Sequence, residues 1–220
     1  MRRLRDLGPD VFPVPEWGFM EYGSSSSSAH KRDALCALAM RVINSYSYVD
    51  YLSDLLALRV TRGNPEAAYA IYKGLRGDGQ KSAATRALVA KYLSGEDQKI
   101  LKRLRRRMEE AEVPRNLLAH GLWYFAREHP ELLIVVDARL LRDDVYLIQS
   151  GSPPPAVVDG GLAPALLDAV VIADGELREW VELNRQLERW WGRFLMIAQG
   201  GLNATAADEL RTRLRREMDV

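Results

Sequence analysis

The feature that most constrains this fold is the recurrence of apolar residues at intervals of three and four along most of the chain. An α-helix turns about 100° per residue, so this spacing places the apolar side chains on one helical face. It predicts a long helix over 33–59 and a second long helix that begins near Asp174 and is closed by Gly200 and Gly201. Shorter helices are predicted over 64–75, 80–93, 94–113 and 205–218.

Two interruptions divide the helical pattern. Pro114 lacks an amide donor and clashes with the preceding turn, which predicts that one helix ends there and another follows over 115–127. Further along, the apolar period changes to two, which predicts strands over 132–136 and 145–149 that pair as a hairpin. The predicted fold is mainly α, a helical bundle with a small β-hairpin before its last long helix.

The predicted organisation is one helical domain over 29–199, with the hairpin at about 131–150 and an appendage at each end. Residues 1–28 are proline-rich and end in the serine run Ser24–Ser28, which buries nothing and is typical of a flexible arm. Residues 200–220 are expected to form a charged helix or tail.

Charge and cysteine content exclude several classes of protein. The 31 Lys and Arg residues nearly balance 30 Asp and Glu residues, which excludes a globally basic nucleic-acid coat but leaves local basic patches open. A single cysteine, Cys36, excludes a disulfide framework or a zinc site with several thiolates, and favours a reducing cytoplasm. Apolar runs fall short of the roughly 20 residues that span a bilayer, so no membrane partner is expected.

The segment most suggestive of chemistry is the run Arg115-Asn116-Leu-Leu-Ala-His120. Asn116 and His120 lie four residues apart and share one helical face, whereas Arg115 diverges from His120 by about 140° on a regular helix. The two converge if Arg115 lies in an irregular first turn after Pro114, where backbone donors at the new helix start also favour an anion. A guanidinium, a helix start and an imidazole together suit a phosphate group.

The same residues resemble the motif of the HEPN superfamily, in which an Arg precedes a His by four to six residues and a polar residue often follows the Arg. The resemblance covers about 33–198 and implies metal-independent RNA cleavage, without a cofactor, in a homodimer whose motifs face each other across a two-fold axis. Such proteins often serve in toxin–antitoxin pairs, phage defence or RNA processing, which implies an antitoxin or regulatory protein as a further partner. One branch carries a Tyr two residues after the His, where this chain has Leu122.

Under this resemblance, each motif residue has an expected role. His120 acts as base on a ribose 2′-hydroxyl or as acid on the leaving 5′-oxygen, and the second protomer supplies the second histidine. Arg115 stabilises charge on the phosphoryl oxygens, and Asn116 holds His120 or a phosphate oxygen. Because the reaction uses the 2′-hydroxyl, RNA rather than DNA is the expected substrate.

Secondary candidates lie outside the motif. Six cations fall between Lys99 and Arg107, and they predict either an RNA-binding patch or an ordinary solvated helix face. The residues predicted to bind RNA are Lys99, Lys102, Arg103, Arg106 and Lys81. Asp50 and Asp54, one turn apart on the first helix, are expected to support the site by orienting His120 or pairing with Arg115.

Two alternatives to a nuclease remain. In the first, Arg115 pairs with Glu110 or Glu112, His120 is buried, and the chain is a non-catalytic module that binds nucleotides, RNA or a partner protein. In the second, the chain is a helical transcription regulator, which rests on the basic helix alone. The exposure of His120 and the approach of two copies across a groove separate these interpretations.

Overall fold

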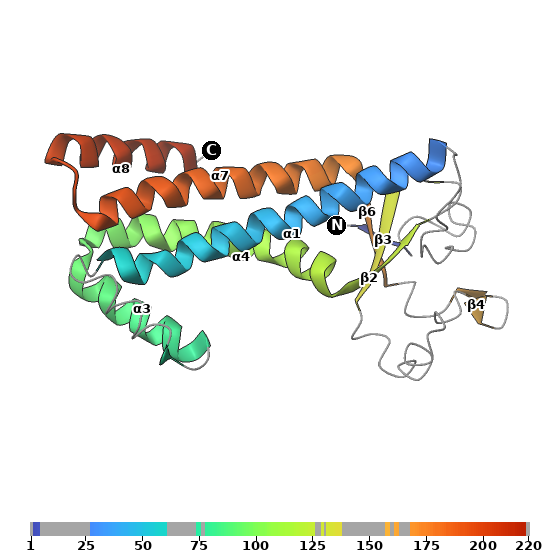
Figure 1. The fold of residues 1–220 in the computed structure, drawn as a ribbon, viewed down its shortest axis with the longest axis horizontal. Coiled ribbons are helices and arrows are strands. Elements are labelled where there is room, and N and C mark those ends of the chain that lie inside the picture. Colours follow the sequence, from blue (N-terminus) through green and yellow to red (C-terminus); the bar gives the residue numbers. More distant parts are fainter. Residues whose placement is uncertain are drawn as a thin grey trace. The chain divides into compact units, whose positions relative to one another are not determined.

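The computed structural model describes residues 2–4, 27–60, 74–75, 78–125, 129, 131–137, 157–158, 161–162 and 168–218. The helices are α1 (Ser27–Val60), α3 (Asp78–Tyr92), α4 (Gly95–His120), α7 (Asp174–Gln199) and α8 (Ala204–Met218), as Figure 1 shows. The strands are β1 (Arg2–Arg3), β2 (Gly121–Phe125), β3 (Leu132–Asp137), β4 (Val157–Val158), β5 (Gly161–Leu162) and β6 (Val170–Ala173). A mainly helical fold with a small antiparallel sheet is therefore confirmed. The helix predicted over 64–75 falls almost wholly outside the described residues.

The chain divides into two compact units, each with its own hydrophobic core. The sheet unit comprises Met1–Asn44 and Glu112–Glu182, and the helical unit comprises Ser45–Ala111 and Leu183–Val220. The helices α1, α4 and α7 each contribute one segment to each unit. The sheet-unit core contains Leu35, Leu38, Ala39, Val42, Leu118, Phe125, Leu133, Val135, Ile172, Leu177 and Val181. None of the described helices combines the length and the apolar character needed to cross a bilayer.

The sheet of the sheet unit has the strand order β1-β6-β3-β2, with antiparallel neighbours throughout. Leu133 to Val136 of β3 are fully buried, as expected for a central strand with both faces covered. Gly121 pairs with Asp137 on one side of β3, and Leu132 pairs with Ala173 on the other. The strand predicted over 132–136 is confirmed, but β2 and β6 occupy both its edges. The partner strand predicted over 145–149 lies outside the described residues.

Strand β2 replaces the second half of the helix predicted over 115–127. The segment Gly121–Phe125 is glycine followed by leucine and three aromatic residues, a composition that suits a pleated, half-buried strand. Tyr124 and Phe125 are buried, and the whole segment pairs with β3. Long-range pairing therefore decides the structure of a segment whose local spacing also fits a helix.

Regular secondary structure is present at both ends of the segment 1–28, which is predicted to be a flexible arm. Arg2 and Arg3 pair with β6, Leu4 is buried, and Arg3 forms an ion pair with Asp168 at 3.0 Å. This pairing satisfies backbone groups that an open edge of β6 would otherwise expose. The helix α1 already begins at Ser27, within the serine run, and residues 5–26 lie outside the described part of the chain.

Pro114 does not break the helix, contrary to prediction, because α4 is one helix of 26 residues with the proline inside it. Buried residues recur along α4 at intervals of three and four, and this stripe continues through the proline: Leu104, Met108, Ala111, Pro114 and Leu118. A proline inside a helix removes one hydrogen bond and clashes with the preceding turn, at a cost of about 3 kcal/mol. Burial of the continuous apolar stripe explains why the helix persists.

In the helical unit, α8 lies alongside α7 (Figure 1). The Glu217 carboxylate of α8 accepts hydrogen bonds from the Trp190 indole at 3.1 Å and from Arg193 at 2.5 Å, both on α7. Leu214 and Met218 of α8 are buried in the helical-unit core. Residues 204–218 therefore form a packed helix, the first of the two forms expected of the C-terminal segment.

Candidate functional site

The three motif residues lie in the last two turns of α4, within the sheet unit. The Arg115 guanidinium donates to the Asn116 side-chain oxygen at 2.7 Å. The Asn116 amide in turn donates to the Glu112 carboxylate at 3.2 Å. Because Glu112, Asn116 and His120 are spaced by four residues, they follow one side of the helix. The structure thus brings Arg115 and Asn116 together and adds Glu112 to them.

The imidazole of His120 is exposed at the end of α4. Among the described residues, none forms a hydrogen bond or an ion pair with this side chain. The alternative in which His120 is a buried, satisfied core residue is therefore wrong. An exposed imidazole, unlike a buried one, is accessible to a substrate and to solvent protons.

The predicted route by which Arg115 meets His120 is also wrong. It required an irregular first turn after Pro114, and α4 is helical across that position. On a regular helix the two Cβ atoms diverge by about 140°, and no new helix start offers backbone donors at Arg115. The Arg115 guanidinium instead reaches the Asn116 side chain, so the pair Asn116 and His120 defines the shared face.

An abrupt junction fixes the position of His120. The helix α4 ends at His120 and β2 begins at Gly121, with no residue between them. A Cβ atom at Gly121 would lie 2.5 Å from the Leu117 carbonyl oxygen and would also overlap the Val135 side chain. Only glycine permits this close approach. The Trp123 indole donates to the Leu118 carbonyl at 2.9 Å, which satisfies one of the last carbonyls of α4.

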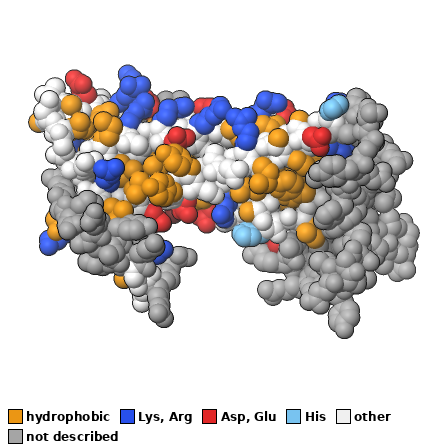
Figure 2. All heavy atoms as spheres, viewed as in Figure 1, with side chains coloured by type: hydrophobic (Ala, Val, Ile, Leu, Met, Phe, Trp, Pro, Cys, Tyr) orange, Lys and Arg blue, Asp and Glu red, His pale blue; other side chains and the backbone are white. Residues whose placement is uncertain are grey.

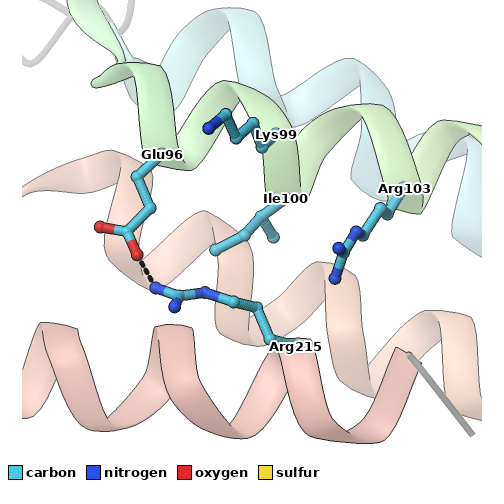
Figure 3. Close-up of a pocket in the computed structure, with 5 residues that line it drawn as sticks. All are labelled: Glu96, Lys99, Ile100, Arg103 and Arg215. Atoms are coloured by element: carbon cyan, nitrogen blue, oxygen red, sulfur yellow. Dashed lines mark ion pairs between the residues drawn. The ribbon is translucent and has the colours of Figure 1, made fainter.

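The predicted RNA-binding residues all lie in the helical unit, but they do not form one patch. Lys99 and Arg103 line a pocket of about 290 Å³ together with Glu96, Ile100 and Arg215, as Figure 3 shows. Arg106 faces solvent and lies 3.6 Å from the Glu110 carboxylate. Lys102 is exposed, and Lys81 is half-buried on α3. The cationic run therefore contributes only two of the predicted residues to a common concave site.

Other cations of the run have structural surroundings. Arg107 forms an ion pair with Glu110 at 2.8 Å. Arg105 is half-buried, and its burial, with the nearby charge of Arg86, lowers the pKa of its guanidinium. Cations also gather over α8, which carries Arg211, Arg213, Arg215 and Arg216, and over the adjoining stretch of α7 (Figure 2).

The two predicted supporting carboxylates, Asp50 and Asp54, are exposed on α1 in the helical unit, whereas the motif belongs to the sheet unit. Within the described ranges, no group of three or more His, Cys, Asp or Glu residues is arranged to hold a metal ion.

Sequence reasoning missed two residues of these sites. Glu112 lies four residues before Asn116, and this spacing alone marks it as a neighbour on the helix face. Arg215 lines the pocket from α8, far along the chain from Lys99 and Arg103. No local sequence signal connects it with α4, because tertiary packing makes the contact.

No family model, curated protein or solved structure matches this chain.

Proposed function

We propose that the protein is a metal-independent endoribonuclease of the HEPN type, which cuts RNA at the Arg115–Asn116–His120 motif of a homodimer. The observation that carries the proposal is the exposed imidazole of His120, one turn beyond the Arg115–Asn116–Glu112 hydrogen-bond chain. Phosphodiester transfer uses an imidazole for proton transfer and a guanidinium for charge stabilisation, and the last two turns of α4 carry one of each.

The proposed chemistry is attack by the ribose 2′-oxygen on the adjacent phosphorus. One His120 accepts the 2′-hydroxyl proton as the new P–O bond forms, and an imidazolium donates a proton to the 5′-oxygen as its P–O bond breaks. The products are a 2′,3′-cyclic phosphate and a 5′-hydroxyl. Arg115 stabilises the charge on the non-bridging oxygens, while Asn116 and Glu112 act as positioning residues that orient its guanidinium.

A second copy of the chain supplies the second histidine. In the sheet unit, Val113 is an exposed large hydrophobic side chain, with 56% of its surface accessible. It lies in the helical turn before Asn116, so an apolar contact there would bring a second motif close to the first.

The direct test measures cleavage of single-stranded and structured RNA by purified protein in excess chelator. We expect His120→Ala to reduce the cleavage rate by about 100-fold to 10,000-fold, because a general acid or base contributes that much. The thermal stability of the variant should be unchanged, because the His120 side chain is exposed and forms no hydrogen bond or ion pair with a described residue. Undiminished cleavage by the variant would contradict the site. Absence of cleavage by the wild-type protein would favour a non-catalytic RNA-binding module.

The dimer is tested separately with Val113→Glu. The fold tolerates a glutamate at this exposed position, but a charge at an apolar contact opposes association. We expect the variant to sediment as a monomer and to lose cleavage while its circular dichroism is unchanged. Met196→Glu, at an exposed methionine of the helical unit, is the matched control and should remain dimeric and active. A dimeric, active Val113→Glu protein would exclude this interface.

A further inference from the structure

The pocket lined by α4 and α8 has a composition suited to a phosphate group. Its lining contains three cations, Lys99, Arg103 and Arg215, and one carboxylate, Glu96, around the side chain of Ile100. Lys99 and Arg103 are one turn apart on α4, and Arg215 reaches toward Glu96 from α8 (Figure 3). The lining therefore has an excess of positive charge over an apolar floor.

A comparison of two arginines on α8 shows which one is available to a ligand. Arg211 binds the buried Asp97 carboxylate through two nitrogens, at 2.7 and 3.1 Å, and also contacts Asp208. Arg215, one turn later, forms an ion pair with Glu96, and the side chains of this pair are 43% and 49% exposed. Arg211 therefore links α8 to α4 through a buried ion pair, whereas the ion pair of Arg215 with Glu96 is exposed and can be displaced by a ligand.

The Arg215 guanidinium also has a donor to offer. Its Nε atom is buried and makes no hydrogen bond to any described residue. Leaving a buried donor unsatisfied is unfavourable, and a turn of the guanidinium away from Glu96 would let an anion in the pocket accept from it. Guanidinium groups bind phosphate through two adjacent N–H groups, and Nε is one member of such a pair.

We propose that this pocket binds a phosphate group, supplied by the backbone of the RNA substrate, with Lys99, Arg103 and Arg215 as its ligands and Glu96 as a competitor for Arg215. The RNA assignment rests on the proposed nuclease function. The volume of about 290 Å³ lies just below the usual range of ligand pockets, about 300 to 1,000 Å³, so one phosphate with its ribose fits better than a larger ligand.

The experiment measures RNA binding in a His120→Ala background, which prevents cleavage. The probe is a fluorescein-labelled oligouridylate, followed by fluorescence anisotropy over a range of salt concentrations. Arg103→Gln and Lys99→Gln should each weaken binding by about tenfold and reduce the salt dependence, because each removes one phosphate contact. Glu96→Gln should tighten binding, since it removes the anion that competes for Arg215.

The matched control is Arg106→Gln. Arg106 lies about one turn after Arg103 on the same helix, but its side chain is 82% exposed and does not line the pocket. The affinity of this variant should stay near that of the parent protein. Equal weakening by Arg103→Gln and Arg106→Gln, or weaker binding by Glu96→Gln, would overturn the pocket assignment. Thermal unfolding of each variant separates lost binding from lost folding.

A second arm distinguishes this inference from the proposed function. Uridine monophosphate is titrated into the same variants by calorimetry. If the pocket variants bind RNA with the affinity of the parent protein while cleavage still depends on His120, the pocket assignment is overturned and the nuclease function stands. If uridine monophosphate follows the expected order of variants while RNA does not bind, the phosphate site is supported, but RNA as its source and the nuclease function are overturned.

Discussion

The polar side chains at the two ends of α4 differ in their burial and in their hydrogen-bond partners. At the N-terminal end, the Ser94 hydroxyl accepts from the Asp97 amide at 3.1 Å and donates to the Asp97 carboxylate at 2.7 Å. Arg211 completes the coordination of that carboxylate. At the C-terminal end, the exposed His120 has no such partner among the described residues. The polar side chains at the start of α4 are held by protein partners, whereas His120 at its end is open to solvent.

The backbone groups at the two ends of α4, in contrast to the side chains, are similar in their hydrogen bonding. Each end of a helix has four backbone groups without intrahelical partners. Ser94 satisfies one at the start of α4, and the Trp123 indole satisfies one at its end. Each end of α4 therefore has one of these groups satisfied by a side chain. The difference lies in the side chains alone, since Asp97 is buried and His120 is not.

The largest expected effect is at the N-terminal end. Asp97→Ala should lower the free energy of unfolding by about 3 kcal/mol, because it leaves Arg211 without its buried partner and removes a helix-capping contact. Chemical denaturation measures the change. Asp208→Ala removes the exposed partner of the same arginine and should cost less than about 0.5 kcal/mol. Equal losses of unfolding free energy in the two variants would contradict the structural role of the buried Asp97 carboxylate.

A smaller loss is expected at the C-terminal junction. Gly121→Ala should lower the free energy of unfolding by about 2 kcal/mol, because the added methyl group overlaps Leu117 and Val135. Its control is Gly175→Ala near the start of α7, where a Cβ atom would meet nothing within 4 Å. Thermal unfolding should show no loss for the control. A neutral Gly121→Ala would show that the junction is not tightly packed.

The smallest effect concerns pH. Hydrogen bonding from Arg213, opposed by desolvation and supported by Arg193 and Trp190, lowers the pKa of Glu217 from 4.5 to about 2. A depressed carboxylate pKa stabilises the fold fully above about pH 4.5, and this contribution is lost as the pH falls toward about 2.

The pKa of Asp97 is also lowered: burial raises it, but hydrogen bonds from Arg211 and Ser94 outweigh the burial. Because a glutamine side chain does not titrate, the free energy of unfolding should fall less steeply with decreasing pH in Glu217→Gln than in the wild-type protein, where Asp97 and Glu217 both contribute. An unchanged acid limb would contradict the depressed pKa.

The sequence predicted the helices because their apolar spacing is local. The helix predicted from residue 94 is confirmed, and Ser94 and Asp97, three residues apart, form hydrogen bonds with each other at its start. By contrast, local rules failed at Pro114, where a buried stripe overrides the helix breaker, and at Gly121–Phe125, where β3 recruits the segment as a strand. Both errors arise from tertiary contacts that no short window of sequence contains.

The candidate site divides in the same way. Arg115, Asn116 and His120 were named from residue type and spacing, and the shared face of Asn116 and His120 follows from the helical repeat. Arg215 was missed because it meets Lys99 and Arg103 only through the packing of α8. Which cations of α4 line the pocket likewise depends on where α8 lies.

The direct passage from His120 into β2 has a mechanical consequence. Helix ends ordinarily fray, because their last turn can unwind into a loop. Here the last turn of α4 cannot unwind unless β2 also separates from β3, since no slack residue connects them. Amide hydrogens around His120 should therefore exchange as slowly as those of the sheet, and the histidine is held on a surface that does not fray.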